Sequence, residues 1–315
     1  MRTAILGAGA MGSVIGSILA EAGADVVLVD ISQPIVDAIR SNGLVVVDKE
    51  GNEKSVRVAA TTDPAAVGQV DLLVVFVKCY HTEAAVGGAL SLLKEKSIVL
   101  SLQNGWGNAA RISRIVGLDR VLLGVSYHSA TLLAPGRVRH GGEGPTYLGE
   151  PNGTISQRAK TVADFLSASG LEVEASTQVL KEIWSKLALN VATLPTSVLA
   201  RLTADQLLNS PEMQTIMQTL LREVVSVAEA LRINLDFSER WDAITGLLRR
   251  LAPNTKGSML QDIENKRRTE IDVINGAVVE IGELYKVATP YNRVMVGLVK
   301  ALETGFQERE QGKGG

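Results

Sequence analysis

The chain of 315 residues is long enough for one large domain or two domains of ordinary size. Its 46% hydrophobic and 21% charged residues exclude disorder for most of its length. With 32 basic against 34 acidic side chains, one cysteine and three histidines, it lacks the charge of a nucleic-acid or anionic-membrane binder and the ligands of a Cys- or His-rich metal centre. We therefore expect no nucleic-acid, membrane or metal partner.

The first segment, Thr3 to Ala20, carries no charge and is long enough to resemble a signal or membrane helix. Four glycines within it disfavour a continuous helix. We therefore interpret the segment as a strand, a turn and a helix, and we expect a cytoplasmic protein.

Short apolar runs alternate with helical patterns in the first half of the chain. Continuous apolar runs are typical of strands that are covered on both faces, and their alternation with helices predicts a parallel sheet. The predicted strands are Thr3–Leu6, Asp25–Val29, Leu72–Val77, Ser97–Leu102 and Val121–Val125, and the predicted helices between the first of them are Ala10–Ala22 and Ile35–Ser41. After the turn at Pro135, Arg137–His140 and Thr146–Gly149 are predicted to form an antiparallel hairpin.

Long helical patterns dominate the second half, with no comparable strand after Val173. The longest predicted helices are Val179–Val191, Pro211–Leu231 and Ile271–Leu284. The prediction is therefore an α/β Rossmann-type parallel-sheet domain, residues 1–175, followed by an all-α C-terminal domain, residues 176–315.

A G-x-G-x-x-G motif lies between the first predicted strand and helix. In this motif Gly7 allows a tight turn, Gly9 lets the backbone approach a pyrophosphate, and Gly12 lets the helix pack on the strand. The predicted cofactor-binding residues of the loop are Gly7, Ala8, Gly9, Ala10, Met11 and Gly12.

An acidic residue ends the second predicted strand, where dinucleotide-binding proteins bind a ribose hydroxyl. Asp30 lies 23 residues after Gly7 and would repel a 2′-phosphate, and no arginine follows among residues 31–33. Asp30 therefore favours NADH over NADPH. The Tyr-x-x-x-Lys pair of short-chain dehydrogenases is absent, whereas a methyltransferase stays open on the glycine loop alone.

Lys186 and Asn190 lie one helical turn apart, beside the apolar stripe of the Val179–Val191 helix. A lysine that is partly withdrawn from water titrates nearer neutrality and can give a proton to an oxygen. The alternative interpretation is a surface lysine whose stem covers apolar groups.

Ser258 and Glu270 form a second candidate pair in the helical half. Ser258 occupies a position typical of a helix N-cap, and Thr269 to Asp272 reads as a capping box that starts a new helix. A bend over residues 265–268 would then bring Glu270 back toward Ser258.

Lys78 and Asn104 each follow a predicted strand of the parallel sheet. The carboxyl ends of parallel strands line the ligand crevice in such sheets. We therefore expect both side chains near the bound ligands.

Taken together, these motifs resemble the ketopantoate reductase (2-dehydropantoate 2-reductase) family over nearly the whole chain. The matching segments are G-A-G-A-M-G at 7–12, V-K at 77–78, Q-N-G-W-G at 103–107, P-G-R-V at 135–138, W-S-K-L-A-L-N at 184–190, S-M-L-Q-D at 258–262 and T-E-I-D-V-I-N-G at 269–276. The resemblance implies a nucleotide-binding domain joined to a helical domain, with a small 2-oxo acid bound between them. It also implies NADPH as cofactor and a role in pantothenate biosynthesis.

The resemblance assigns roles to individual residues. Lys186 would protonate the ketone oxygen during hydride transfer, with Glu270 as the second catalytic residue. The implied substrate-binding residues are Asn190, Ser258, Asn104 and Lys78, and Lys78, Asn104 and Glu270 would also contact the cofactor.

Two positions depart from the family pattern. Asp30-Ile31-Ser32 replaces the arginine of NADPH users, and Leu194-Pro195 replaces a frequent Asn-Pro whose asparagine contacts substrate. The second departure favours a bulkier, more apolar 2-oxo acid, as in the NAD-dependent D-2-hydroxyacid (mandelate-type) dehydrogenases that resemble this family. We expect reduction of a 2-oxo acid to a D-2-hydroxy acid, with ketopantoate first, mandelate-type substrates second and a non-catalytic nucleotide sensor as a remote alternative. Apolar helical faces in the second half would permit a homodimer.

Overall fold

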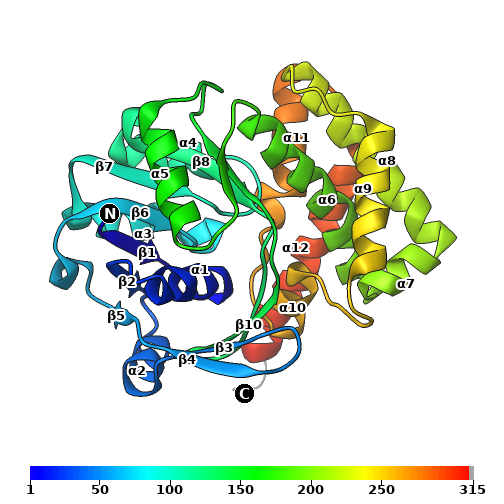
Figure 1. Ribbon diagram of the computed structural model, residues 1–315. Coiled ribbons are helices and arrows are strands. Elements are labelled where there is room, and N and C mark those ends of the chain that lie inside the picture. Colours follow the sequence, from blue (N-terminus) through cyan, green and yellow to red (C-terminus); the bar gives the residue numbers. More distant parts are fainter. Residues whose placement is uncertain (312–315) are drawn as a thin grey trace. The chain divides into compact units, whose positions relative to one another are not determined.

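The computed structural model describes residues 1–311, and its packing divides the chain into two compact units (Figure 1). The first unit comprises Met1–Gln103 and Asn108–Leu180, and the second comprises Asn104–Gly107 and the chain from Lys181 on. Apart from the loop 104–107, the division along the chain therefore falls between residues 180 and 181, whereas the sequence pattern predicted it between 175 and 176. Four residues of a loop also leave the first unit and join the second.

The first unit is built on an eight-stranded sheet, which confirms the predicted Rossmann-type domain. Strands β1, β2, β5, β6, β7 and β8 run parallel, whereas β11 runs antiparallel to β8 at one end. In sheet order the strands are β12 (Val173–Ala175), β11 (Thr146–Gly149), β8 (Val121–Ser126), β7 (Leu93–Ser101), β6 (Val70–Val75), β1 (Thr3–Leu6), β2 (Val26–Val29) and β5 (Ala59–Thr61).

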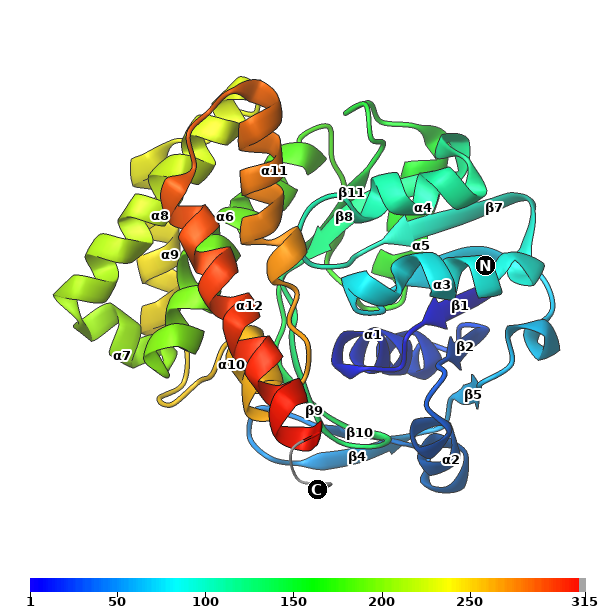
Figure 2. The same ribbon diagram turned by 180° about the vertical axis from the view of Figure 1, so that it is seen from behind.

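Helices cover both faces of this sheet because successive side chains of each strand point to opposite sides. Ile5 packs with α1 and α5, whereas Ala4 and Leu6 pack with α3 and α4. Figure 1 shows α1 and α5 in front of the sheet, and Figure 2 shows α3 and α4 from behind. The helices of this unit are α1 (Ala10–Glu21), α2 (Gln33–Asn42), α3 (Thr82–Gly88), α4 (Asn108–Val116) and α5 (Gln157–Ala168).

A second sheet of four strands corrects the predicted hairpin. Arg137 and its neighbours form β10, which pairs antiparallel with β9 and parallel with β3, whereas Thr146–Gly149 joins the main sheet. The hairpin prediction was wrong because both edges of β10 are already paired. One edge pairs with β9, and the other pairs with β3, which lies about ninety positions earlier in the chain. The strands in order are β4 (Glu53–Val56), β3 (Leu44–Val47), β10 (Arg137–Gly142) and β9 (Ser129–Ala134).

The described part of the second unit is helical, as predicted. Its central helix, α6 (Val179–Ala200), begins at the end of the first unit and continues beyond the predicted end at Val191, through Pro195. Most α6 side chains are buried, including the indole of Trp184. The other helices are α7 (Ala204–Asn209), α8 (Pro211–Ala230), α9 (Phe237–Arg250), α10 (Ser258–Glu264), α11 (Asn275–Tyr285) and α12 (Pro290–Gln311).

The predicted helix Ile271–Leu284 is interrupted. A short 3-10 turn, Ile271–Val273, comes first, and α11 begins only at Asn275. Between them, Ile274 has φ −101° and ψ −96°, which is outside the helical region. Within residues 1–311, no helix combines the length and apolar character needed to cross a membrane.

Candidate functional site

The glycine loop of the first unit has the tight geometry that its motif predicts. Gly7 takes φ +105°, and a Cβ atom there would lie 2.9 Å from the backbone nitrogen of Val77. A Cβ atom on Gly12 would lie 1.9 Å from the carbonyl oxygen of Gly7. Only glycine fits at either position, because one needs a left-handed backbone and the other a close approach of helix and turn.

Gly9 differs from these two glycines because open space surrounds it. It precedes the first turn of α1, no side chain caps that end, and a Cβ atom on Gly9 would meet nothing within 4 Å. The first backbone N–H groups of a helix have no acceptor within the helix and attract anions. The loop therefore fits a pyrophosphate group held by backbone N–H groups.

The carboxylate of Asp30 is held against the glycine loop. Its Oδ2 accepts a hydrogen bond from the backbone N–H of Ala8 at 2.7 Å, and its Oδ1 accepts one from Ser32 at 2.8 Å. Each carboxylate oxygen retains acceptor capacity, which a ribose hydroxyl could use. The next residue is Ile31, whose apolar side chain is 84% exposed. Position 31 therefore offers no positive charge to a 2′-phosphate.

A buried glutamine that the sequence reasoning did not single out supports the loop of Lys78. The Gln103 side-chain amide donates to the Val77 carbonyl at 2.7 Å and to the Thr82 hydroxyl at 2.8 Å. These two bonds bracket Lys78, which directly precedes the short turn Cys79–His81. The Gln103 side-chain oxygen also accepts a hydrogen bond from the Ser101 hydroxyl, two residues earlier. The position of Gln103 directly after a predicted strand was the sequence feature that could have indicated its role.

In the second unit, the amine of Lys186 is withdrawn from water. Burial lowers the pKa of its amine to about 8, and the nearby carboxylate of Glu270 acts in the opposite direction. Asn190 follows one turn later on α6 and is buried. The structure thus brings Glu270 close to Lys186, which the sequence pattern alone did not require.

The chain bends before Glu270, as predicted. Helix α10 ends at Glu264, Lys266 takes the left-handed conformation with φ +53°, and the Arg267 N–H bonds to the Asp262 carbonyl at 2.8 Å. These features terminate the helix, because a left-handed residue with a bond back to the last turn is a common helix C-terminus. Glu270 then lies buried at the start of the 3-10 turn.

The capping box predicted for residues 269–272 does not form. The Thr269 hydroxyl accepts from the Ile271 N–H at 3.2 Å and donates to Glu303 at 2.6 Å, and Asp272 pairs with Arg268 and Lys300. The carboxylate of Glu303, on α12, also accepts from the Thr269 N–H at 2.7 Å. A tertiary contact therefore replaces the local capping interaction.

Ser258 is the first residue of α10 rather than its N-cap. Gly257, which has an extended backbone, takes the N-cap position, and a Cβ atom on it would lie 2.8 Å from Cδ2 of Leu194. The first turn of α10, which carries Ser258, thus packs beside Leu194 of α6.

The loop of Asn104 packs within the second unit although it follows strand β7 of the first. The Trp106 N–H donates to the Val273 carbonyl at 2.8 Å, and the rings of Trp106 and Trp184 lie 5.6 Å apart. Gly105 has φ +83°, and a Cβ atom there would lie 2.4 Å from the Val273 oxygen. The loop that carries Asn104 is therefore anchored, through Gly105 and Trp106, to the turn that follows Glu270 and to the helix that carries Lys186.

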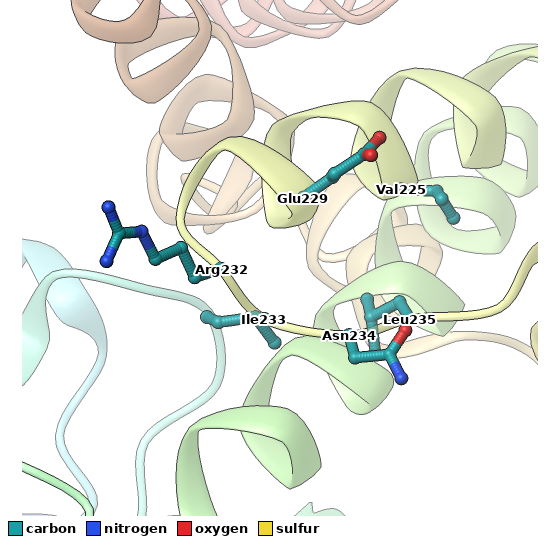
Figure 3. A pocket seen from close by; sticks show the side chains of 6 residues that line it. All are labelled: Val225, Glu229, Arg232, Ile233, Asn234 and Leu235. Carbon is teal, nitrogen blue, oxygen red and sulfur yellow. The ribbon is translucent and has the colours of Figure 1, made fainter.

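The structure groups the predicted residues by unit. The glycine loop, Asp30 and Lys78 belong to the first unit, and Asn104, Lys186, Asn190, Ser258 and Glu270 belong to the second. A pocket of about 360 Å³ at the C-terminal end of α8 is lined by none of these residues (Figure 3). Its lining residues are Val225, Glu229, Arg232, Ile233, Asn234 and Leu235.

Two family models match the chain. The model described as "Ketopantoate reductase PanE/ApbA" covers residues 3–153, and its C-terminal counterpart covers residues 178–303. Curated relatives include the 2-dehydropantoate 2-reductases of Halobacterium salinarum and Pyrococcus horikoshii. Both are 33% identical; the alignments cover 95% and 96% of this chain and 98% of each relative.

Solved structures are also similar. A ternary complex of D-mandelate dehydrogenase with NADH and anilino(oxo)acetate is 32% identical with a TM-score of 0.91, and the alignment covers 98% of this chain and all of that one. A PanE/ApbA family ketopantoate reductase from Ralstonia eutropha is 32% identical with a TM-score of 0.86 over the same shares.

Proposed function

Because the chain belongs to the ketopantoate reductase family, we propose that it reduces a 2-oxo acid to a D-2-hydroxy acid with a nicotinamide cofactor, ketopantoate being the first candidate. The observation that carries this proposal is Lys186, whose pKa burial lowers to about 8 beside Glu270. A proton donor that titrates near neutrality suits reduction of a ketone.

NADH is the proposed cofactor. When bound, it supplies the hydride that is added to the carbonyl carbon. The open space around Gly9 and the uncapped start of α1 suit its pyrophosphate. Asp30, which two backbone N–H groups hold beside the loop, suits a free 2′-hydroxyl and repels a 2′-phosphate.

The second unit would provide the proton. The amine of Lys186 gives its proton to the ketone oxygen as the carbonyl carbon gains the hydride, which leaves a hydroxyl group and a neutral amine. Water then returns a proton to the amine. Glu270 favours the charged form of Lys186 before transfer, and Asn190 and Ser258 are proposed to hold the hydroxyl and carboxylate groups of the substrate.

A second candidate substrate class is the branched or aromatic 2-oxo acids of mandelate-type dehydrogenases. Leu194 supports it, because this buried apolar side chain packs against Gly257, next to Ser258. An apolar wall there would satisfy no substrate hydroxyl. The D-mandelate dehydrogenase complex, which holds NADH and an anilino-substituted oxo acid, is a neighbour at 32% identity.

The test is a panel of 2-oxo acids assayed with NADH and with NADPH. The proposal expects oxidation of NADH by at least one of ketopantoate, branched 2-oxo acids and phenylglyoxylate. The relative kcat/KM values choose between the two substrate classes. Cofactor binding without turnover of any of these acids would favour the nucleotide-sensing alternative, and a preference for NADPH would contradict the role of Asp30.

We also propose a homodimer formed through the second unit. Tyr291, Val294 and Leu298 are 57%, 56% and 47% exposed at helical spacing on α12, and Leu284 at the end of α11 is 75% exposed. Such an apolar stripe is typical of an interaction surface, and two-fold dimers are the commonest assemblies. Light scattering of the wild type should give twice the mass of one chain, and V294D should reduce the measured mass to that of a single chain. A monomeric wild type would contradict the proposal.

A further inference from the structure

Pro195 breaks the hydrogen-bond ladder of the helix that carries Lys186. In an α-helix each carbonyl accepts from the N–H four residues later, but proline has no N–H. The Val191 carbonyl therefore has no helical donor at position 195. Residues 191–198 of α6 are all buried, so water cannot readily supply the missing bond.

Asn275 supplies that bond from another helix. Its side-chain Nδ2 donates to the Val191 carbonyl at 3.2 Å and to Oδ1 of Asn292 at 2.9 Å. Asn275 is fully buried at the first position of α11, and its own Oδ1 is buried without a hydrogen-bond partner. The side chain thus acts as a donor to two acceptors.

The direction of these bonds is set by a buried carboxylate. Glu223 on α8 accepts from the backbone N–H groups of Tyr291 and Asn292, both at 2.9 Å, and from Nδ2 of Asn292 at 2.6 Å. Because Asn292 must turn its amide nitrogen to Glu223, its Oδ1 is left to accept from Asn275. The arrangement therefore requires an N–H donor at position 275.

We infer that Asn275 is a positioning residue for the proposed reaction, acting through the bond that Pro195 cannot make. Asn190 directly precedes Val191, and Lys186 lies one turn earlier. Leaving a buried carbonyl without a donor costs free energy, which a tilt of the helix would relieve. Small displacements of reacting groups slow catalysis. The inference rests on the proposed function for its kinetic consequence.

The test is a double-mutant cycle, since P195A restores a backbone N–H for the Val191 carbonyl. N275A should lower kcat about ten-fold, with NADH dissociation constant unchanged, because the glycine loop lies in the other unit. In the P195A background the same change should cost less than about two-fold.

Two further variants sharpen the test. T193A removes a 2.8 Å side-chain bond to the Leu189 carbonyl, which already has a helical donor, and should leave kcat unchanged. N275D turns a carboxylate toward two acceptors and should lower kcat more than N275A does.

Equal losses of kcat in both backgrounds would overturn the inference, as would N275A lowering the melting temperature while kcat at saturation stays unchanged. If N275A does not fold, folding of the P195A/N275A double variant would support the inference, and a double variant that also fails to fold would overturn it.

If the wild type reduces no 2-oxo acid, the proposed function fails independently of this inference. Hydrogen exchange of residues 186–199 then decides, since N275A should accelerate it only when Pro195 is present.

Discussion

The burial of Lys186 lowers the pKa of its amine to about 8, which predicts a pH dependence of activity near that value. In the proposed mechanism reduction needs the protonated amine, so kcat/KM for reduction should fall as the pH rises through about 8, and kcat/KM for oxidation of the hydroxy acid should rise over the same range. The negative charge of Glu270 raises the pKa of Lys186. E270Q should therefore move both profiles to lower pH.

The comparison is the pH dependence of kcat/KM for the wild type, E270Q and E264Q. Glu264, at the end of α10, forms an exposed ion pair with Lys256. E264Q should therefore leave the midpoint of the pH profile unchanged. A midpoint that E270Q leaves unchanged or raises would contradict the electrostatic role of Glu270.

Asp30 and Ile31 carry the proposed cofactor preference. Replacing the carboxylate and adding a cation in D30S/I31R should shift the ratio of kcat/KM values toward NADPH by at least about ten-fold, because the repulsion of a 2′-phosphate is lost and a charged partner is gained. I31A is the control for loss of the exposed isoleucine. A ratio that stays at the wild-type value in D30S/I31R would show that the second strand does not select the cofactor.

Helix α12 is anchored at its first turn by a side chain from α8. Glu223 accepts three hydrogen bonds there, two of them from backbone N–H groups. E223Q must turn an amide NH₂ toward one of these donors, so it should lower the free energy of unfolding by about 1–3 kcal/mol. Denaturant unfolding measures the change.

E229Q on the same helix is the matched control, because Glu229 is exposed. Its effect should stay within about 0.5 kcal/mol. Equal free energies of unfolding for E223Q and E229Q would contradict the prediction that the buried carboxylate of Glu223 stabilises the start of α12.

The two packing units divide the proposed chemistry between them. Lys186 lies in the second unit, whereas the glycine loop and Asp30 lie in the first. K186M should therefore lower kcat by at least about a hundred-fold while NADH binding, measured by fluorescence titration, stays within about two-fold. Weakened NADH binding with normal turnover would reverse the assignment.

Patterns local in the chain predicted much of this protein. The strand, glycine turn, helix and acid of residues 3–30 are recognisable because each needs a residue type at a short, fixed spacing. The same holds for Lys186 and Asn190 on one helix. The roles of these residues stay predictions until the variants are measured.

Partners distant in the chain could not be read from such patterns. Strand β10 pairs with β3, Asn104 joins the second unit, and Thr269 is held by Glu303 instead of a capping box. Asn275 meets the Val191 carbonyl across 84 positions. Periodicity specifies which face of an element is buried, whereas the side chain that meets a given buried polar atom depends on how the elements pack.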